Sequence, residues 1–283
     1  MPAHLSKSVG RRLSRTGFAR LALLPLAIVA TAFFLLPMIK LVIVGASGEM
    51  GLGAYAAILF EPRYRASLIS TVVLAAATTI AALAAATIAG LFLQRHRFPG
   101  RAVLIAMLTF PLAFPGVVVG FMIILLAGRQ GLVGDLTSRL LGEKIVLAYS
   151  IQGLFLGYLY FSIPRVILTI MAAVEKLDPA LEEAARTLGA GPWAVHRDVI
   201  FPALGPAFVA SGAIVFATAM GAFGTAFTLA TNIDVLPMVI YTEFTLSANI
   251  AMAAALSVGL GVVAWASLAF ARSLSGGTVA AAG

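Results

Sequence analysis

Cysteine is absent from this chain of 283 residues, and histidine occurs only three times. The absence of cysteine excludes disulfides and thiolate metal sites. His4, His96 and His196 all lie in polar stretches, and none has a second ligand at metal-binding spacing. A zinc site is therefore not expected.

Charge is also scarce. Only 11% of the residues are charged and 61% are hydrophobic, whereas soluble domains carry about 25% charged residues. A soluble fold of this size has too little interior for so much apolar surface, so lipid must be the main solvent. The net charge of +8 fits cytoplasmic loops rich in Lys and Arg. A nucleic-acid partner is not expected, because no basic stripe is interleaved with aromatic residues.

Six continuous apolar runs are long enough to cross a bilayer as helices, which takes about 20 residues. A transmembrane β-barrel is excluded, because its strands would alternate apolar and polar residues. The first run contains a cleavage-like Ala30-Thr31-Ala32, but it continues too far for a signal peptide and is expected to stay as a helix. The expected spans are 18–44, 66–93, 102–127, 146–172, 204–230 and 247–271.

The distribution of basic residues predicts the orientation. Twelve Lys and Arg residues lie on the side that holds both termini and five on the other, which places both termini in the cytoplasm. Loops near 46–65, 128–145 and 231–246 are then external. Residues 1–17 form a cytoplasmic tail, 18–272 a single transmembrane domain, and 273–283 a small polar tail that is expected to be disordered.

The longest cytoplasmic segment, 174–203, is predicted to form two short helices. Asp178 suits an N-cap and Pro179 the first helical position. Gly189 or Gly191 is expected to end the first helix. A second helix starts at Pro192 and is expected to break at Pro202.

The first of these helices carries an apolar stripe outside the membrane, formed by Leu181, Ala184, Ala185 and Leu188. An exposed apolar stripe usually marks a partner surface. The alternative from the residues alone is a helix that lies on the lipid surface or packs under its own bundle.

The same segment resembles a known family motif. Glu183-Ala184-Ala185, three residues, Gly189, nine residues and then 199–202 (Val-Ile-Phe-Pro) match the spacing of the EAA loop of ABC importer permeases, with Val199 and Phe201 replacing the usual Ile and Leu. The resemblance covers about residues 60–272. It implies the type I importer fold, which is all-α with six transmembrane helices, in the bacterial inner membrane.

In that family the EAA loop docks on a cytoplasmic ATPase dimer, which binds the ATP and Mg²⁺. The resemblance implies that Glu183 anchors the contact, that Ala184 and Ala185 permit close approach, and that Gly189 makes the turn, where a side chain is expected to clash. Leu188 and Pro202 belong to the same coupling surface. The other implied partners are a second permease subunit, identical or homologous, and a periplasmic binding protein. The chain itself has no phosphate-cradling loop, and no catalytic residue or cofactor is expected.

Three residues are candidates for the solute pathway: Arg165, Phe223 and Thr225. Arg165 lies inside the fourth span, where a charge must face water or a partner unless it reaches the interface by snorkelling. Phe223 and Thr225 lie in 221–225, which is expected to bend the fifth span or to let it pack closely against another helix. Prolines at 111 and 115 are expected to do the same in the third.

The solute is expected to be small and charged. Residues 236–240 (Leu-Pro-Met-Val-Ile) resemble the polyamine, ferric-iron, thiamine and aminoethylphosphonate branch of the family, and Arg165 favours an anion over a dication. Polar residues Asn232, Asp234, Glu243 and Asn249 are expected to form a solvated external loop. Two other classes are disfavoured. A secondary transporter or channel needs acidic residues within its spans, and the central parts of the six runs contain none. An intramembrane enzyme needs paired catalytic residues, which these runs do not supply either.

Overall fold

The computed structural model describes residues 23–229 and 233–274, and these residues form helices without a strand. The first helix runs over Leu23–Gly45. The named elements are η1 (Thr31–Leu35), α2 (Leu36–Gly45), α3 (Gly53–Phe60), α4 (Pro62–Arg95), α5 (Arg101–Thr109), η2 (Phe110–Ala113), α6 (Gly116–Ala127), α7 (Leu132–Leu141), α8 (Ile151–Glu175), α9 (Pro179–Thr187), α10 (Pro192–Val195), η3 (His196–Ile200), α11 (Phe201–Ala203), α12 (Gly205–Met220), α13 (Phe223–Leu229), α14 (Leu236–Thr245) and α15 (Ile250–Leu274). The expected terminal tails lie almost wholly outside the described residues.

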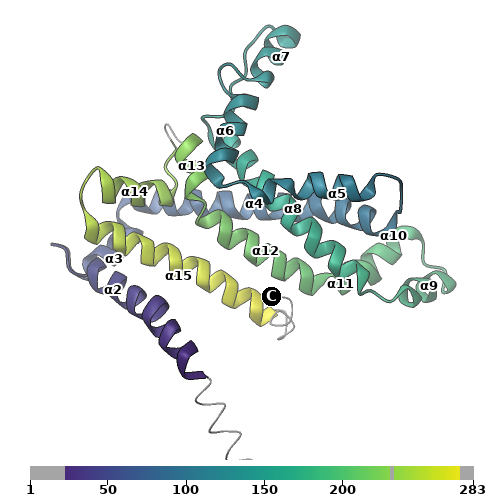
Figure 1. Cartoon of the computed structure of the whole chain (residues 1–283), viewed down its shortest axis with the longest axis horizontal. Coiled ribbons are helices and arrows are strands. Elements are labelled where there is room, and N and C mark those ends of the chain that lie inside the picture. Colours follow the sequence, from purple (N-terminus) through teal and green to yellow (C-terminus); the bar gives the residue numbers. More distant parts are fainter. Residues whose placement is uncertain (1–22, 230–232, 275–283) are drawn as a thin grey trace, which may run out of the picture.

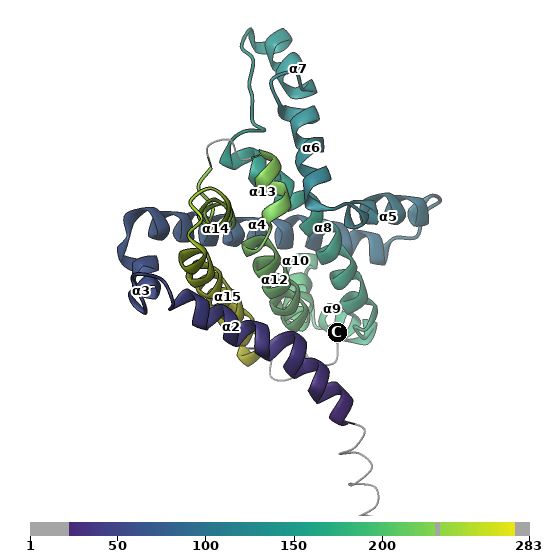
Figure 2. The same cartoon turned by 60° about the vertical axis from the view of Figure 1, so that its left-hand side comes forward.

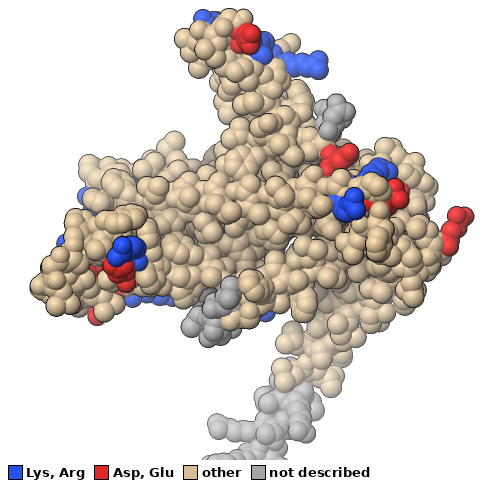
Figure 3. Space-filling view, turned by 180° about the vertical axis from the view of Figure 1, so that it is seen from behind, with Lys and Arg blue, Asp and Glu red and all other residues tan. Residues whose placement is uncertain are grey.

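The bundle consists of α4, α8, α12 and α15, with α2 beside α15 (Figures 1 and 2). Buried side chains of α4, α8 and α12 contribute to two apolar core clusters, one toward each end of these helices. The segments predicted to lie on the cytoplasmic side, α9–α11 and the link from α4 to α5, gather at one end of the bundle, whereas α3 and α14 lie at the other (Figure 1). On the face drawn in Figure 3, charged side chains gather mainly at the two ends and at the tip of α7, with a largely uncharged surface between them.

The prediction of an all-helical membrane protein is confirmed, with five to six helices that can span a membrane, the third over Gly116–Leu141 and not over 102–127. Five helices of the described residues are long and apolar enough to cross a membrane, and a bent pair makes a sixth. Four of the predicted runs, 18–44, 66–93, 146–172 and 247–271, correspond to helices over 23–45, 62–95, 151–175 and 250–274. A continuous apolar run identifies these helices, because a segment surrounded by lipid must be apolar and must satisfy its own backbone hydrogen bonds.

The third predicted span is broken where its prolines occur. α5 passes into the 3-10 turn η2, Phe114 and Pro115 are extended, and α6 begins at Gly116. Proline has no N–H to donate and disfavours the helical conformation in the residue before it, which explains extended Phe114. α6 and α7 then project from the bundle on the side away from α2 (Figures 1 and 2).

The fifth predicted span, 204–230, is also divided. α12 ends at Met220, and α13 starts at Phe223 after a turn at Gly221. The bend expected in this stretch is therefore confirmed. At its other end α12 meets the helical stretch Pro192–Ala203 at an angle of 62°.

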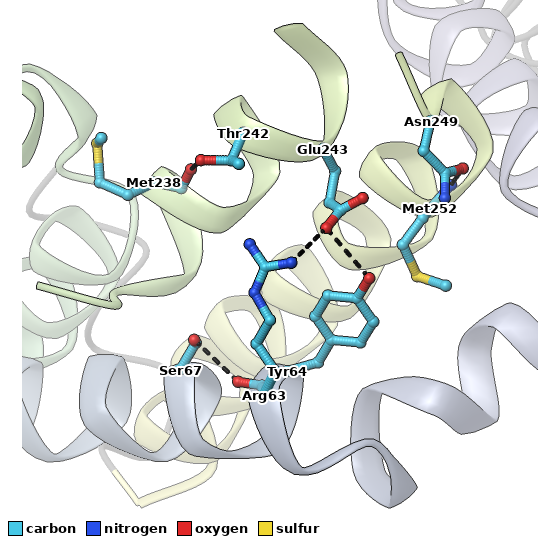
Figure 4. A network of polar contacts seen from close by, with 8 residues as sticks. All are labelled: Arg63, Tyr64, Ser67, Met238, Thr242, Glu243, Asn249 and Met252. Carbon is cyan, nitrogen blue, oxygen red and sulfur yellow. Dashed lines mark hydrogen bonds and ion pairs between the residues drawn. The ribbon is translucent and has the colours of Figure 1, made fainter. Parts of the chain in front are cut away.

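The external loops are more ordered than the sequence predicts. α3, α7 and α14 are short helices within 46–65, 128–145 and 231–246. The expectation that Glu243 belongs to a solvated loop is wrong, because its side chain is only 5% exposed. Arg63 Nη1 donates to its Oε1 at 3.0 Å and the Tyr64 hydroxyl donates to the same oxygen at 3.2 Å, so α14 is fastened to the start of α4 (Figure 4). Asn249 caps α15 through Met252 N at 3.1 Å, Asp234 is exposed, and Asn232 is outside the described residues.

Candidate functional site

The segment between α8 and α12 begins with a well-capped helix. The Asp178 carboxylate accepts a hydrogen bond from Ala180 N at 2.9 Å, and Pro179 occupies the first turn of α9. Both features agree with the prediction. A capping carboxylate satisfies a backbone donor that the helix leaves unpaired and also complements the helix dipole.

α9 ends in a Schellman turn at Gly189. Gly189 N donates to Arg186 O at 2.9 Å, and Ala190 N donates to Ala185 O at 3.0 Å. Gly189 has φ +85°, a conformation that costs a residue with a Cβ about 1–2 kcal/mol. The expected clash is wrong, because a Cβ at this position would meet no atom of the described residues within 4 Å. The constraint on Gly189 therefore comes from its backbone alone.

Two consecutive glutamates of α9 have different surroundings. Glu182 is partly buried and forms ion pairs with Arg95, at the end of α4, and with Arg186 at 3.8 Å. Glu183 is exposed and makes no hydrogen bond or ion pair with any described residue. Glu182 thus ties α9 to the bundle, whereas the carboxylate of Glu183 is available to a partner.

The residues of the predicted apolar stripe on α9 have two different environments, one buried and one exposed. Ala185 packs against the core under α9. Leu181 and Leu188 are exposed by 54% and 88%, and Trp193 on α10 by 68%. Ala184 is exposed as well. Exposed apolar side chains beside a free carboxylate make this surface suitable for a protein partner.

The second half of the segment is one irregular helix. α10, the π-turn η3 and α11 follow each other without a break, so Pro202 does not end the helix as expected. Proline lacks the N–H that would close the regular pattern, and the chain bends only after Ala203. Arg197 forms two hydrogen bonds to the exposed Asp198 carboxylate, at 2.7 and 2.9 Å, which lower the pKa of Asp198.

The three pathway candidates line one cavity of about 370 Å³. It lies where the break between η2 and α6 meets the break between α12 and α13. Arg165 reaches it from α8 and donates from Nη1 to the Thr218 hydroxyl at 3.2 Å, its hydrogen-bond partner among the described residues. The guanidinium therefore faces a polar hollow and has no acidic partner there.

Phe223 and Thr225 contribute differently to this cavity. Phe223 is 37% exposed and packs with Phe227 and Tyr241, with ring centroids 5.3 and 5.5 Å away. Thr225 is buried, and its hydroxyl donates to Gly116 O at 3.0 Å. Its side chain therefore joins the two broken helices across the cavity wall.

Glycine allows α6 and α13 to approach closely. A Cβ on Gly116 would lie 3.1 Å from Thr225 N, and one on Gly120 would lie 2.6 Å from the Cβ of Thr228. Small residues commonly permit such backbone contact between membrane helices. The cavity wall is therefore fixed by packing at this contact.

Sequence reasoning missed several residues of these sites. Thr218, which binds Arg165, looks like any other small residue of an apolar run. The Arg95–Glu182 pair joins positions 87 apart, and the Arg63–Glu243 pair joins positions 180 apart. The charges of all four residues are visible in the sequence, but which of them pair depends on the fold.

Comparison with known proteins defines the class of this chain. Residues 82–276 match the family described as binding-protein-dependent transport system inner membrane component. The chain belongs to this family: it is a multi-pass inner-membrane permease subunit of a binding-protein-dependent ABC importer, and the family is one of transport permeases, not enzymes.

Two relatives and one solved structure are similar to this chain over most of its length. The chain is 31% identical over 237 residues to the putative 2-aminoethylphosphonate transport system permease protein PhnU of Salmonella typhimurium, covering 82% of this chain and 83% of the relative. It is 35% identical over 189 residues to the molybdenum transport system permease protein ModB of Escherichia coli, covering 65% and 81%. A crystal structure of a bacterial alginate ABC transporter with a pentasaccharide-bound periplasmic protein has a chain of the same fold, with a TM-score of 0.79 at 18% identity, covering 94% of this chain and 96% of that one.

Proposed function

We propose that this permease is driven by a cytoplasmic ATPase that docks on α9 and α10, and that it imports a small oxyanion through the Arg165 cavity. The observation that carries the proposal is the guanidinium of Arg165, which lines a hollow in the bundle with a neutral hydroxyl as its partner. A planar guanidinium matches the oxygens of phosphonate, sulfate or molybdate in a way that a polyamine does not.

The names of the relatives agree with an anionic solute. They include transport systems for 2-aminoethylphosphonate, molybdenum and sulfate. Ions of this kind share a tetrahedral centre with several oxygens. The cavity of about 370 Å³ has room for such an ion together with some of its hydration water.

The coupling role rests on the surface of α9. Exposed Leu181 and Leu188 lie beside the unpaired carboxylate of Glu183, while Glu182 holds α9 to α4 through Arg95. A partner that moves α9 therefore also pulls on the end of α4 and, through the bend after Ala203, on α12. This is a mechanical link between an ATPase outside the membrane and the helices around Arg165.

A second permease subunit, identical or homologous, is the other partner that we propose. The most apolar stretch of the first helix, Leu23–Gly45, is not buried within this chain, so lipid or another subunit must cover it. A periplasmic binding protein would deliver the solute at the α3 and α14 end.

The alternative function is a secondary transporter that works without an ATPase. It needs acids that take up and release protons within the spans. Among the described residues Glu243 is the buried acid, and it is engaged by Arg63 and Tyr64 at one end of α4. This arrangement favours the importer.

Uptake by the complete transporter in reconstituted vesicles tests the proposal. We expect ATP-dependent uptake of labelled 2-aminoethylphosphonate, sulfate or molybdate that is abolished by Arg165→Ala and partly kept by Arg165→Lys, which retains the charge but not the planar fork. Arg139→Ala, on exposed α7, is the control and should transport normally. Polyamine uptake that survives Arg165→Ala would overturn the anionic solute and the role of Arg165.

A further inference from the structure

The Arg165 cavity is followed by a second one along the same pair of helices. The second cavity has a volume of about 610 Å³ and is lined by α8 and by the α11–α12 stretch. It is lined by Leu168, Thr169 and Ala172 of α8 and by Lys176, the residue that caps the end of α8. It therefore begins about one helical turn beyond Arg165 and extends toward the end of the bundle that carries α9.

The helical spacing shows that the two cavities share one face of each helix. Arg165, Thr169, Ala172 and Lys176 are separated by four, three and four residues, so they follow one side of α8. On α12 the residues Ala207, Ala210, Ile214 and Thr218 are spaced in the same way, and Ile214 between the cavities is 47% exposed. We call this shared face of α8 and α12 the seam.

The seam has a cationic residue at each end and mostly small or apolar side chains between them. Arg165 is at one end, and Lys176 is the cationic residue that lines the second cavity. Eleven residues of helix separate them by about 16 Å. Neither cation has an acid within 4.0 Å among the described residues, and none of the described residues that line the two cavities is acidic.

We propose that the seam is the inward half of the solute pathway and that Lys176 is a second anion-binding station, where the solute leaves Arg165 for the cytoplasm. The proposal rests on the proposed function, because it uses the same anionic solute. The walls are mostly apolar, and the Thr169 hydroxyl already donates to Arg165 O at 3.0 Å, so an oxyanion in the seam is attracted mainly by the two charges. Lys176 supplies a compact, flexible cation, which binds less specifically than a guanidinium and so favours release.

The cysteine-free chain allows a direct test of water and charge in the seam. Ala172→Cys places a thiol in its wall, one turn or about 6 Å from Lys176. Ile88→Cys, on an exposed face of α4 that lines neither cavity, is the control. Each variant is labelled in inverted membrane vesicles that contain the complete transporter, with an anionic sulfonate thiol reagent and with a cationic trimethylammonium one.

We expect the thiol at 172 to react with both reagents and faster with the anionic one, whereas the thiol at 88 reacts with neither. Adding Lys176→Gln should lower the ratio of anionic to cationic rates about threefold, from Coulomb's law at this distance with salt screening. Lys176→Arg should preserve the ratio. A thiol at 172 that does not react, or a ratio that Lys176→Gln leaves unchanged, would overturn the proposal.

Uptake of labelled sulfate, molybdate and 2-aminoethylphosphonate gives the functional readout. Lys176→Gln should slow anion uptake at least threefold and Lys176→Arg should restore it, with Arg97→Gln, on the exposed link from α4 to α5, as the unaffected control. Failure of the two proposals is distinguishable. If Arg165→Ala abolishes uptake while Lys176→Gln changes neither uptake nor labelling, Lys176 is only a basic residue at a helix end and the second station alone is refuted.

Discussion

The turn at Gly189 provides the sharpest test of the coupling segment. Its φ of +85° is strained for any residue with a Cβ, yet an added Cβ would meet no atom of the described part of the chain within 4 Å. Gly189→Ser should therefore cost about 1–2 kcal/mol through the backbone alone. That energy reduces the population of the native turn relative to open forms by a factor of about 5–30.

The matched control lies two residues away. Gly191 also has no atom within 4 Å of an added Cβ, but its φ of −70° suits any residue, and it is the N-cap of α10. Gly191→Ser should be neutral or slightly stabilising, because serine is a good N-cap. The two variants therefore make the same chemical change in similarly open surroundings, and they differ in φ and in the N-cap position of residue 191.

The assay compares solute uptake with solute-stimulated ATP hydrolysis in vesicles that contain the complete transporter. Gly189→Ser should lower both while the complex still assembles, because α9 is a surface element and the apolar core is untouched. Gly189→Val should be worse and Gly189→Asn better, since asparagine tolerates this conformation. Equal activity of Gly189→Ser and Gly191→Ser would refute the reasoning.

Three further predictions concern the rest of the chain. Single cysteines at Ser138 and Thr187 should label from the periplasm and from the cytoplasm respectively with an impermeant thiol reagent, and labelling of Thr187 from the periplasm would invert the topology. Gly120→Val should lower the free energy of unfolding of the purified protein by about 1–3 kcal/mol, because the new Cβ would lie 2.6 Å from the opposing α13 side chain. Gly261→Val is the control, because its Cβ would meet no atom of the described residues within 4 Å. Arg63→Ala should lower the free energy of unfolding by about 1–2 kcal/mol, because it removes the half-exposed cationic partner of a buried carboxylate. Arg63→Lys should lose less, and an Arg63→Ala variant that melts at the wild-type temperature would show that the ion pair contributes nothing.

Much of the fold was visible in the sequence, for a physical reason. A membrane span must be continuously apolar and must satisfy its own backbone, so hydropathy identifies helices such as α4 and α15 directly. Proline and glycine act on the local backbone, so the breaks at Pro115 and Gly221 could be predicted as well. The capping of α9 by Asp178 is equally local.

The rest depends on packing between distant segments. Whether an added Cβ at Gly189 meets another atom cannot be known before its neighbours are placed. The burial of Glu243 follows from the meeting of α14 with α4, and the division of the α9 stripe follows from its attachment through Arg95. The short helices α3, α7 and α14 were missed because they carry no long apolar run.

Crosslinking from α9 tests the central claim, that an ATPase drives this permease through the coupling segment. A photoactivatable probe on Leu188→Cys, the most exposed apolar side chain of that surface, should capture the ATP-binding subunit in cells that express the whole transporter. The same probe on Leu140→Cys, exposed by 73% on α7, should not capture it. Capture of the ATPase by the probe at 140 with none at 188, in a transporter that still takes up its solute, would contradict the account.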